Sequence, residues 1–267
     1  MKFDCIVMNP PYQRNLHLKI LAEAIKHLKD DESVCVNLSP DNWLMKHNVN
    51  NPIGAYRKTF NGMLTSIDVI SHNDMNAMFN TGNAIEEGCI TAYSNSKTKT
   101  HIDLEQYGFS TPVEKSLYTK VSKFKDGVMS IHRALGSGGI AVYGKSNVQY
   151  AVGIYGWHGG NSCYEAIVVD GDEKPYISIE FNTAEEKKNF LASLHTTFME
   201  WYYKAFIVPG NYIIKNHFFL LHNAVNPRTK LKGYQSEWTD DDLYKFFNIT
   251  PEEQKVIEET MAKYDHK

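Results

Sequence analysis

The chain has 267 residues, of which 42% are hydrophobic and 22% are charged, and its formal net charge is −3. This balance is typical of a globular protein with enough apolar material for a core, and it excludes a chain that is basic throughout and binds nucleic acid by charge alone. No apolar run approaches the ~20 residues needed to span a bilayer, and the first residues do not form a signal peptide. We therefore expect no membrane segment and a cytoplasmic location, in a bacterium or after phage infection.

Apolar strand runs alternate with helix-spaced apolar residues through the first third of the chain. Residues 3–8 are a short apolar run, and apolar residues then recur at helical spacing over 16–28. Further strands are expected over 34–38, 64–70 and 88–93, and a helix is expected over 43–45 that resumes at 54–59. This alternation predicts an α/β fold.

The pattern changes after a polar stretch at residues 94–101. A helix is expected over 110–133, and short β-like runs separated by glycines follow between 136 and 179. Further helices are expected over 182–203, 240–247 and 251–261, with Thr250 as the N-cap of the last. We therefore divide the chain into a first domain (1–105), an α+β region (106–235) and a C-terminal helical tail (236–267).

The tetrapeptide Asn9-Pro10-Pro11-Tyr12 directly follows the first apolar run. A strand that runs into a turn places these side chains at the carboxyl edge of a sheet, where open α/β sheets bind ligands. The two prolines fix φ and remove two backbone donors, which makes the turn rigid. An Asn oxygen and a backbone carbonyl can hold an exocyclic amino group, and a Tyr ring can stack on a base flipped out of its helix. The alternative is an ordinary turn, because Asn and Pro are common turn formers.

Three stretches resemble motifs of adenine-N6-specific DNA methyltransferases of the Eco57I-type restriction-modification group. Residues 3–13 resemble the catalytic motif, residues 38–44 resemble the strand, Pro and Trp-Leu step that follows, and residues 238–253 resemble the C-terminal helical signature. The resemblance implies a partial Rossmann-like methyltransferase sheet, then an α+β target-recognition region, then C-terminal helices.

The same resemblance assigns roles to the residues of the turn. Asn9 and the Pro10 carbonyl would accept hydrogen bonds from the adenine amino group, Pro11 would hold the turn, and Tyr12 would stack on the flipped base. Gln13 would line the mouth of the pocket. A second aromatic stacking on the base is expected from Tyr93 or Phe79, with packing as the alternative role for both.

The chain also departs from the methyltransferase pattern. In that group a glycine-rich loop that binds S-adenosylmethionine lies before the Asn-Pro-Pro-Tyr step, and residues 1–8 leave no room for it. The glycine-rich stretch at 135–140 lacks a strand before it and a helix after it, so we interpret it as a turn between strands. We therefore expect the cofactor to be bound mainly by a partner chain. Without the cofactor half, residues 3–8 become an exposed edge strand that should pair with a second polypeptide or with a second copy, unless it is covered internally.

Contacts to DNA phosphates are expected from local basic residues, with a solvated surface as the alternative for each: Lys97, Lys99, Arg228, Lys230 and Lys232. The cysteines are widely spaced and the 11 histidines are scattered, so neither a disulfide framework nor a metal site is expected.

The sequence supports two classes of function. The first is a DNA adenine-N6 methyltransferase, or a subunit of one in a restriction-modification type system, that needs a partner for its cofactor-binding half. The alternative is a catalytically inactive, methyltransferase-like protein that binds DNA or another protein, such as a phage anti-restriction factor. Intact Asn9 and Tyr12 favour the first, and the missing glycine-rich loop favours the second.

Overall fold

The computed structural model describes residues 1–50, 52–80, 87–127, 141–143, 149–154, 168–169, 177–193, 195–202, 205 and 236–264. The chain divides into two compact units, Met1–Lys115 and Ser116–Lys267. Among the residues so described, no helix is long and apolar enough to cross a membrane.

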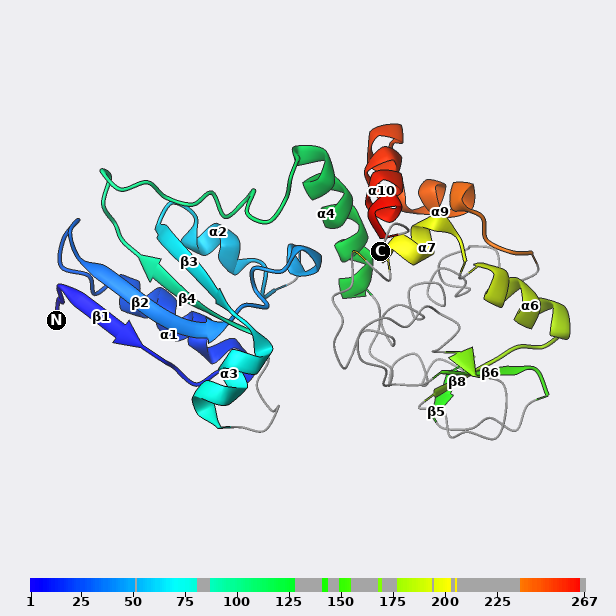
Figure 1. Ribbon diagram of the computed structural model, residues 1–267, viewed down its shortest axis with the longest axis horizontal. Coiled ribbons are helices and arrows are strands. Elements are labelled where there is room, and N and C mark those ends of the chain that lie inside the picture. The colour runs from blue at the N-terminus through cyan, green and yellow to red at the C-terminus, as the bar shows by residue number, and fades with distance from the viewer. Residues whose placement is uncertain are drawn as a thin grey trace. The chain divides into compact units, whose positions relative to one another are not determined.

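The first unit is built on a four-stranded mixed sheet, which confirms the predicted α/β class (Figure 1). Its strands are β1 (Cys5–Met8), β2 (Val34–Pro40), β3 (Leu64–Ile70) and β4 (Gly88–Tyr93), in the spatial order β1-β2-β4-β3. β1 and β2 are parallel, whereas β4 runs antiparallel to both of its neighbours. β1 is therefore an edge strand, as expected.

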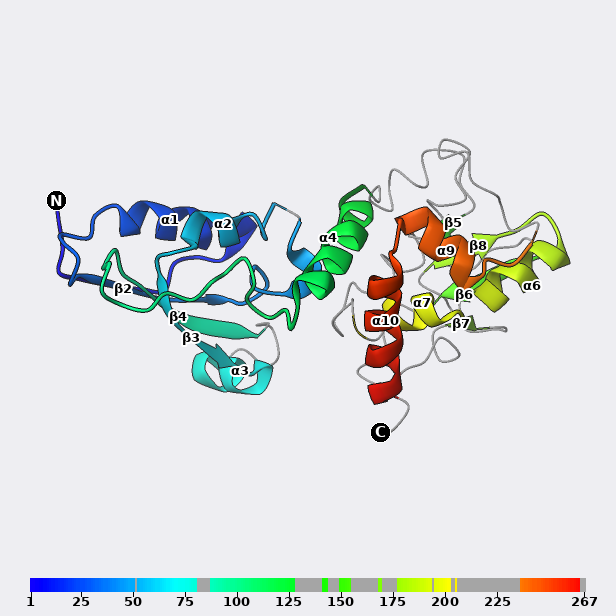
Figure 2. The ribbon, with the colours of Figure 1, turned by 90° about the horizontal axis from the view of Figure 1, so that it is seen from above.

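Three helices lie against this sheet. α1 (Leu16–Ile25) and α2 (Tyr56–Phe60) lie on one face, and α3 (His72–Phe79) lies on the other side of the sheet (Figure 2). The core fills the space between the sheet and the first two helices, because the apolar positions of α1 recur at helical spacing and point inward. Its fully buried members include Leu18, Leu21, Cys35, Trp43, Phe60, Leu64 and Tyr93.

The helix predicted over 43–45 is wrong. Trp43 and Leu44 lie in a turn, which a short 3-10 helix η2 (Lys46–Asn48) follows. The buried guanidinium of Arg57 donates to the carbonyls of Trp43 and Leu44. Those carbonyls are therefore bonded to a side chain instead of to the N–H groups of a following helical turn.

α3 was not predicted, although a local signal for it exists. The Ser71 hydroxyl accepts from the N–H of Asp74 and also donates to the Asp74 carboxylate, which caps the first turn. A Ser followed three residues later by an acid is a recognisable N-terminal signature, and it lies directly after β3.

The second unit contains an antiparallel sheet of four short strands in the order β5-β8-β6-β7. Its strands are β5 (Ala141–Tyr143), β6 (Ala151–Ile154), β7 (Val168–Val169) and β8 (Ile177–Glu180). The helices are α6 (Ala184–Ser193), α7 (Thr197–Trp201), α9 (Asp240–Phe247) and α10 (Pro251–Tyr264), and α4 (Pro112–Gly127) crosses the boundary between the units. The glycine-rich stretch at 135–140 lies outside the described residues.

The helix predicted over 182–203 is divided into α6 and α7. Thr196 caps α7, because its hydroxyl accepts from the N–H of Met199. The carboxylate of Asp240 also accepts from the N–H groups of Thr197 and Phe198, at 3.0 and 2.7 Å. Asp240 is 42–43 residues from these partners in the sequence, so the break depends on a long-range contact. The predicted Thr250 cap of α10 is confirmed, since its hydroxyl accepts from the N–H of Glu253.

Candidate functional site

The Asn-Pro-Pro-Tyr turn begins where β1 ends. β1 and β2 run parallel, and Met8 lies beside Asn37 of β2, so Asn9 directly follows the carboxyl end of this parallel pair. That edge is where ligands bind in open α/β sheets. Pro10 is buried and anchors the turn, while Asn9 and Pro11 are exposed and Tyr12 is partly exposed.

The Tyr12 hydroxyl donates a hydrogen bond of 2.7 Å to Oδ1 of Asn9. Burial raises the pKa of Tyr12, so the phenol keeps its proton at neutral pH and remains a donor. The two side chains that the motif supplies are therefore bonded to each other. An amide oxygen has two lone pairs, so Asn9 Oδ1 can accept a second hydrogen bond from an incoming amino group.

The backbone directly after Tyr12 is strained. Arg14 and Asn15 have φ values of 50° and 61°, so two consecutive residues other than glycine lie in the left-handed region. For Arg14 this conformation costs ~1 kcal/mol or more, whereas Asn tolerates it better. Such residues concentrate at functional sites, where the surrounding structure holds them in place. They end the 3-10 helix η1 (Gln13–Asn15) and turn the chain into α1.

Two buried polar side chains lie beneath this turn, and sequence reasoning missed both. His17 of α1 is 1% exposed, and its ring meets the Tyr12 ring edge-on with 5.7 Å between centroids. Burial lowers the pKa of His17, and the Tyr12 carbonyl offsets part of this effect. Asn37 of β2 is 0% exposed, and neither end of its amide has a hydrogen-bond partner among the residues that the structure describes. The sequence signal was a polar residue inside an apolar run in each case.

The other predicted pocket residues differ in how far they are exposed. Gln13 is exposed at the start of η1, and Phe79 is partly exposed at the end of α3. Tyr93 is 0% exposed, and its ring packs 5.4 Å from that of Phe60. It pairs with Cys35, near the amino end of β2 and not at the carboxyl end where Asn9 lies. Tyr93 is thus a core residue in this structure, which is the packing role given above as the alternative.

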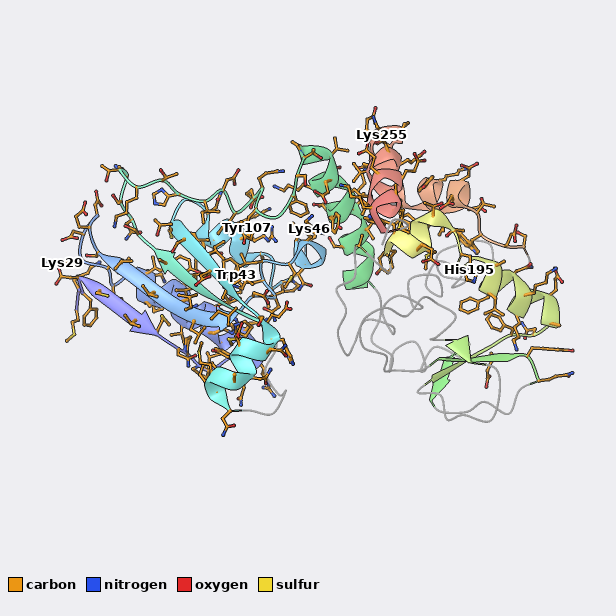
Figure 3. The ribbon with its side chains drawn as sticks, viewed as in Figure 1. Lys29, Trp43, Lys46, Tyr107, His195 and Lys255 are labelled. Carbon is orange, nitrogen blue, oxygen red and sulfur yellow. The ribbon has the colours of Figure 1, made fainter. Side chains whose placement is uncertain are left out.

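The aromatic core around Tyr93 also includes Trp43. This side chain is fully buried, and its ring lies 5.6 Å from that of Phe60 (Figure 3). Trp43 therefore supports the sheet from the side that α1 and α2 cover.

The two predicted basic residues that the structure describes do not lie at the turn. Lys97 is exposed and Lys99 is partly exposed, in the segment that follows the end of β4. Because β4 is antiparallel to β2, that segment begins beside the amino end of β2, whereas Asn9 lies toward its carboxyl end. Arg228, Lys230 and Lys232 lie outside the described residues.

Two strand-to-helix passages of the first unit are fully described. There the chain passes from strand to helix through Asn-Pro-Pro-Tyr after β1 and through Ser71 after β3, and neither passage is glycine-rich. An Asn oxygen and an aromatic ring are groups that can hold a flat base with an amino group. Within the described ranges, no group of three or more His, Cys, Asp or Glu side chains lies close enough together to hold a metal ion.

Comparison with known proteins yields no match to a family model, to a curated protein or to a solved structure.

Proposed function

We propose that this chain is the base-binding part of a DNA adenine-N6 methyltransferase of the restriction-modification type. The observation that carries the proposal is the bonded pair of Asn9 and Tyr12 on a rigid turn at the carboxyl end of β1. An acceptor and an aromatic ring are placed together there, next to a parallel βαβ unit formed by β1, α1 and β2. The Rossmann-like character of the sheet is part of this proposal, and the βαβ unit supports it.

The turn would act on the amino nitrogen of adenine. The lone pair of that nitrogen is conjugated with the ring, which makes it a poor nucleophile. Asn9 Oδ1 and the Pro10 carbonyl would accept its two hydrogens and favour a tetrahedral nitrogen with a free lone pair. Tyr12 would give up its bond to Asn9 and stack on the base, which offsets part of the few kcal/mol needed for flipping.

S-adenosylmethionine would supply the methyl group from a site that a partner chain mainly forms. The passages after β1 and β3 are not glycine-rich, and within the described ranges no strand pairs with the outer edge of β1. The chain's own contribution is to bind the base, orient its amino group and hold the two acceptors in place.

A second candidate is a catalytically inactive protein with the same architecture that binds DNA or another protein, as an anti-restriction factor would. The observation that favours it is that neither the passage after β1 nor the passage after β3 is glycine-rich. The two candidates differ in whether any partner allows methyl transfer.

The test is transfer of labelled methyl groups to DNA by the chain together with polypeptides encoded next to it. Asn9→Ala should lower the rate by ~10²–10³, the usual effect of losing one preorganised contact in the transition state. Because Asn9 is exposed, its loss should leave the thermal midpoint nearly unchanged. Lys19→Ala, at an exposed position of α1, is the matched control. Unchanged activity in Asn9→Ala would exclude the turn as the catalytic site, and DNA or protein binding without any methylation would favour the second candidate.

A further inference from the structure

His17 occupies a core position of α1 directly after the turn. It is the first member of the buried stripe His17, Leu21 and Ile25, whose residues recur every fourth position and point to the same side of the helix. The side chain is 1% exposed, and burial lowers the pKa of His17, so its ring is neutral at pH 7. An apolar residue would fill this position without the cost of removing a polar ring from water. Packing of the core alone therefore does not account for a histidine here.

The ring of His17 contacts the ring of Tyr12. The two centroids are 5.7 Å apart and the ring planes are inclined at 78°, which is the edge-to-face geometry that aromatic pairs favour. The Tyr12 carbonyl also acts on the imidazole, because it offsets part of the effect of burial on the pKa of His17. His17 thus meets Tyr12 at both its ring and its backbone.

This contact depends on a strained backbone. Tyr12 and His17 do not lie on one continuous helix, since Arg14 and Asn15 between them have left-handed conformations. Such a conformation costs free energy for Arg14. The buried polar ring and the strained backbone are both departures from the most stable choice, and both adjoin Tyr12. Departures of this kind concentrate at functional sites.

Tyr12 is held at two points. Its hydroxyl donates to Oδ1 of Asn9, and its ring meets His17. In the proposed function the hydroxyl leaves Asn9 when Tyr12 stacks on the base. The contact with His17 does not involve Asn9, so it is independent of this exchange and keeps the plane of the Tyr12 ring fixed. A ring that is already held in its stacking orientation loses less conformational freedom on binding.

We propose that His17 is a positioning residue of the base-binding turn, and that its ring holds the Tyr12 ring in the orientation that stacks on a flipped adenine. His17 acts through Tyr12 and does not touch the base, because it is buried beneath the turn. This inference rests on the proposed function and deepens it, since it names the residue that sets how well the turn captures the base.

A purely structural role for His17 has different consequences. If the side chain only fills the core, a residue of similar volume replaces it, and any loss of base binding follows a loss of stability. If it positions Tyr12, base binding and stability separate. Leucine distinguishes the two roles, because it fills the apolar stripe but offers no ring edge to Tyr12.

The test measures binding of an adenine by the full chain. The probe is single-stranded oligothymidine that carries one adenine with 2-aminopurine beside it, and the fluorescence of 2-aminopurine reports binding. His17→Leu should bind this probe ~3–10-fold more weakly than the parent chain, while its thermal midpoint stays equal or rises. The double variant of His17→Leu with Tyr12→Ala should bind no more weakly than Tyr12→Ala alone, because a residue that acts through Tyr12 has no further effect once that ring is gone.

Two further variants complete the design. Leu21→Met is the matched control, because it alters the same buried stripe one turn further along α1 with little change in volume, and it should bind as the parent chain does. His17→Phe keeps an aromatic ring at the position, so it should bind the probe more tightly than His17→Leu does.

Several results would overturn the inference. They are binding by His17→Leu as tight as that of the parent chain, a loss that adds in full to the loss from Tyr12→Ala, a fall in thermal midpoint that accompanies the weaker binding, or binding by His17→Phe no tighter than that of His17→Leu.

The same experiment separates this inference from the proposed function. Weaker binding by Tyr12→Ala without any effect of His17→Leu would reject the role of His17 and leave the base-binding turn standing. Binding that depends on both residues, in a chain that no partner enables to transfer methyl groups, would support the role of His17 and reject the enzyme. Binding that does not depend on Tyr12 would reject both.

Discussion

Tyr12 and Asn9 are joined by a hydrogen bond of 2.7 Å in which the phenol is the donor and the side-chain oxygen of Asn9 is the acceptor. The bond closes the Asn-Pro-Pro-Tyr turn on itself, just before two residues in left-handed backbone conformations. Asn9 Oδ1 is also the proposed acceptor for the adenine amino group, and stacking of Tyr12 on the base would exchange the phenol for that amino group. The net loss from this exchange is small, since a hydrogen bond is replaced and not simply broken.

The first prediction separates the hydroxyl of Tyr12 from its ring. Tyr12→Phe removes the competing donor and keeps the stacking surface, so it should bind single-stranded DNA with 2-aminopurine next to the target adenine as well as the parent chain does, or up to ~10-fold more tightly. Tyr12→Ala removes the ring and should lose ~1–3 kcal/mol of stacking. Quenching of 2-aminopurine fluorescence measures both. Equal weakening by the two substitutions would show that the hydroxyl, and not stacking, carries recognition.

The second prediction concerns the cofactor. The isolated chain should bind S-adenosylmethionine weakly or not at all, because the described part of the first unit has no glycine-rich strand-to-helix loop. Isothermal titration calorimetry with the purified chain measures this directly. A tight one-to-one complex would contradict the proposal that a partner chain supplies most of the cofactor site.

The third prediction concerns the stability of the first unit. Arg57 is 2% exposed and donates to the carbonyls of Trp43 and Tyr107, at 3.2 and 3.0 Å, and to that of Leu44. Burial lowers its pKa to about 10, so the guanidinium remains charged at neutral pH. Arg57→Met keeps much of the side-chain stem but leaves buried carbonyls without donors, which should lower the free energy of unfolding by about 3 kcal/mol.

Urea denaturation measures the effect of Arg57→Met. Lys58→Met is the matched control, because Lys58 is the next residue of α2 and is exposed. Arg57→Lys should recover only part of the stability, since a compact ammonium group cannot reach several carbonyls at once. Equal midpoints for Arg57→Met and Lys58→Met would show that the buried guanidinium does not stabilise this unit.

The fourth prediction concerns thiol reactivity. Burial raises the pKa of Cys35 to about 11 and that of Cys89 to about 12, whereas Cys5 is exposed on the edge strand. At pH 8 only about one Cys35 thiol in a thousand is ionised, and the thiolate is the reactive form. Among the three described cysteines, iodoacetamide should therefore modify Cys5 first and reach Cys35 and Cys89 only after denaturation, as peptide mass mapping can follow. Modification of Cys35 at the rate of Cys5 would show that the sheet opens readily.

Local patterns predicted many of the elements. β3 and β4 match their predicted bounds because each is a run of strand-forming residues that ends at a turn or a polar residue. α9 also matches its predicted bounds, because its cap and acidic first turn are encoded within a few residues. The helix predicted over 182–203 could not be placed correctly in this way, since its break depends on Asp240, which is far away in the sequence.

The sequence by itself determined the Asn-Pro-Pro-Tyr turn after an apolar strand, because prolines and strand propensity act over a few residues. Only the tertiary structure decided that β4 lies between β2 and β3, that Tyr93 is in the core, and that His17 and Asn37 are buried beneath the turn. It also decided that α1 and α2 lie on one face of the sheet and α3 on the other (Figure 2). Strand order, register and burial are set by contacts between distant segments, and no local residue pattern encodes which segments will be neighbours.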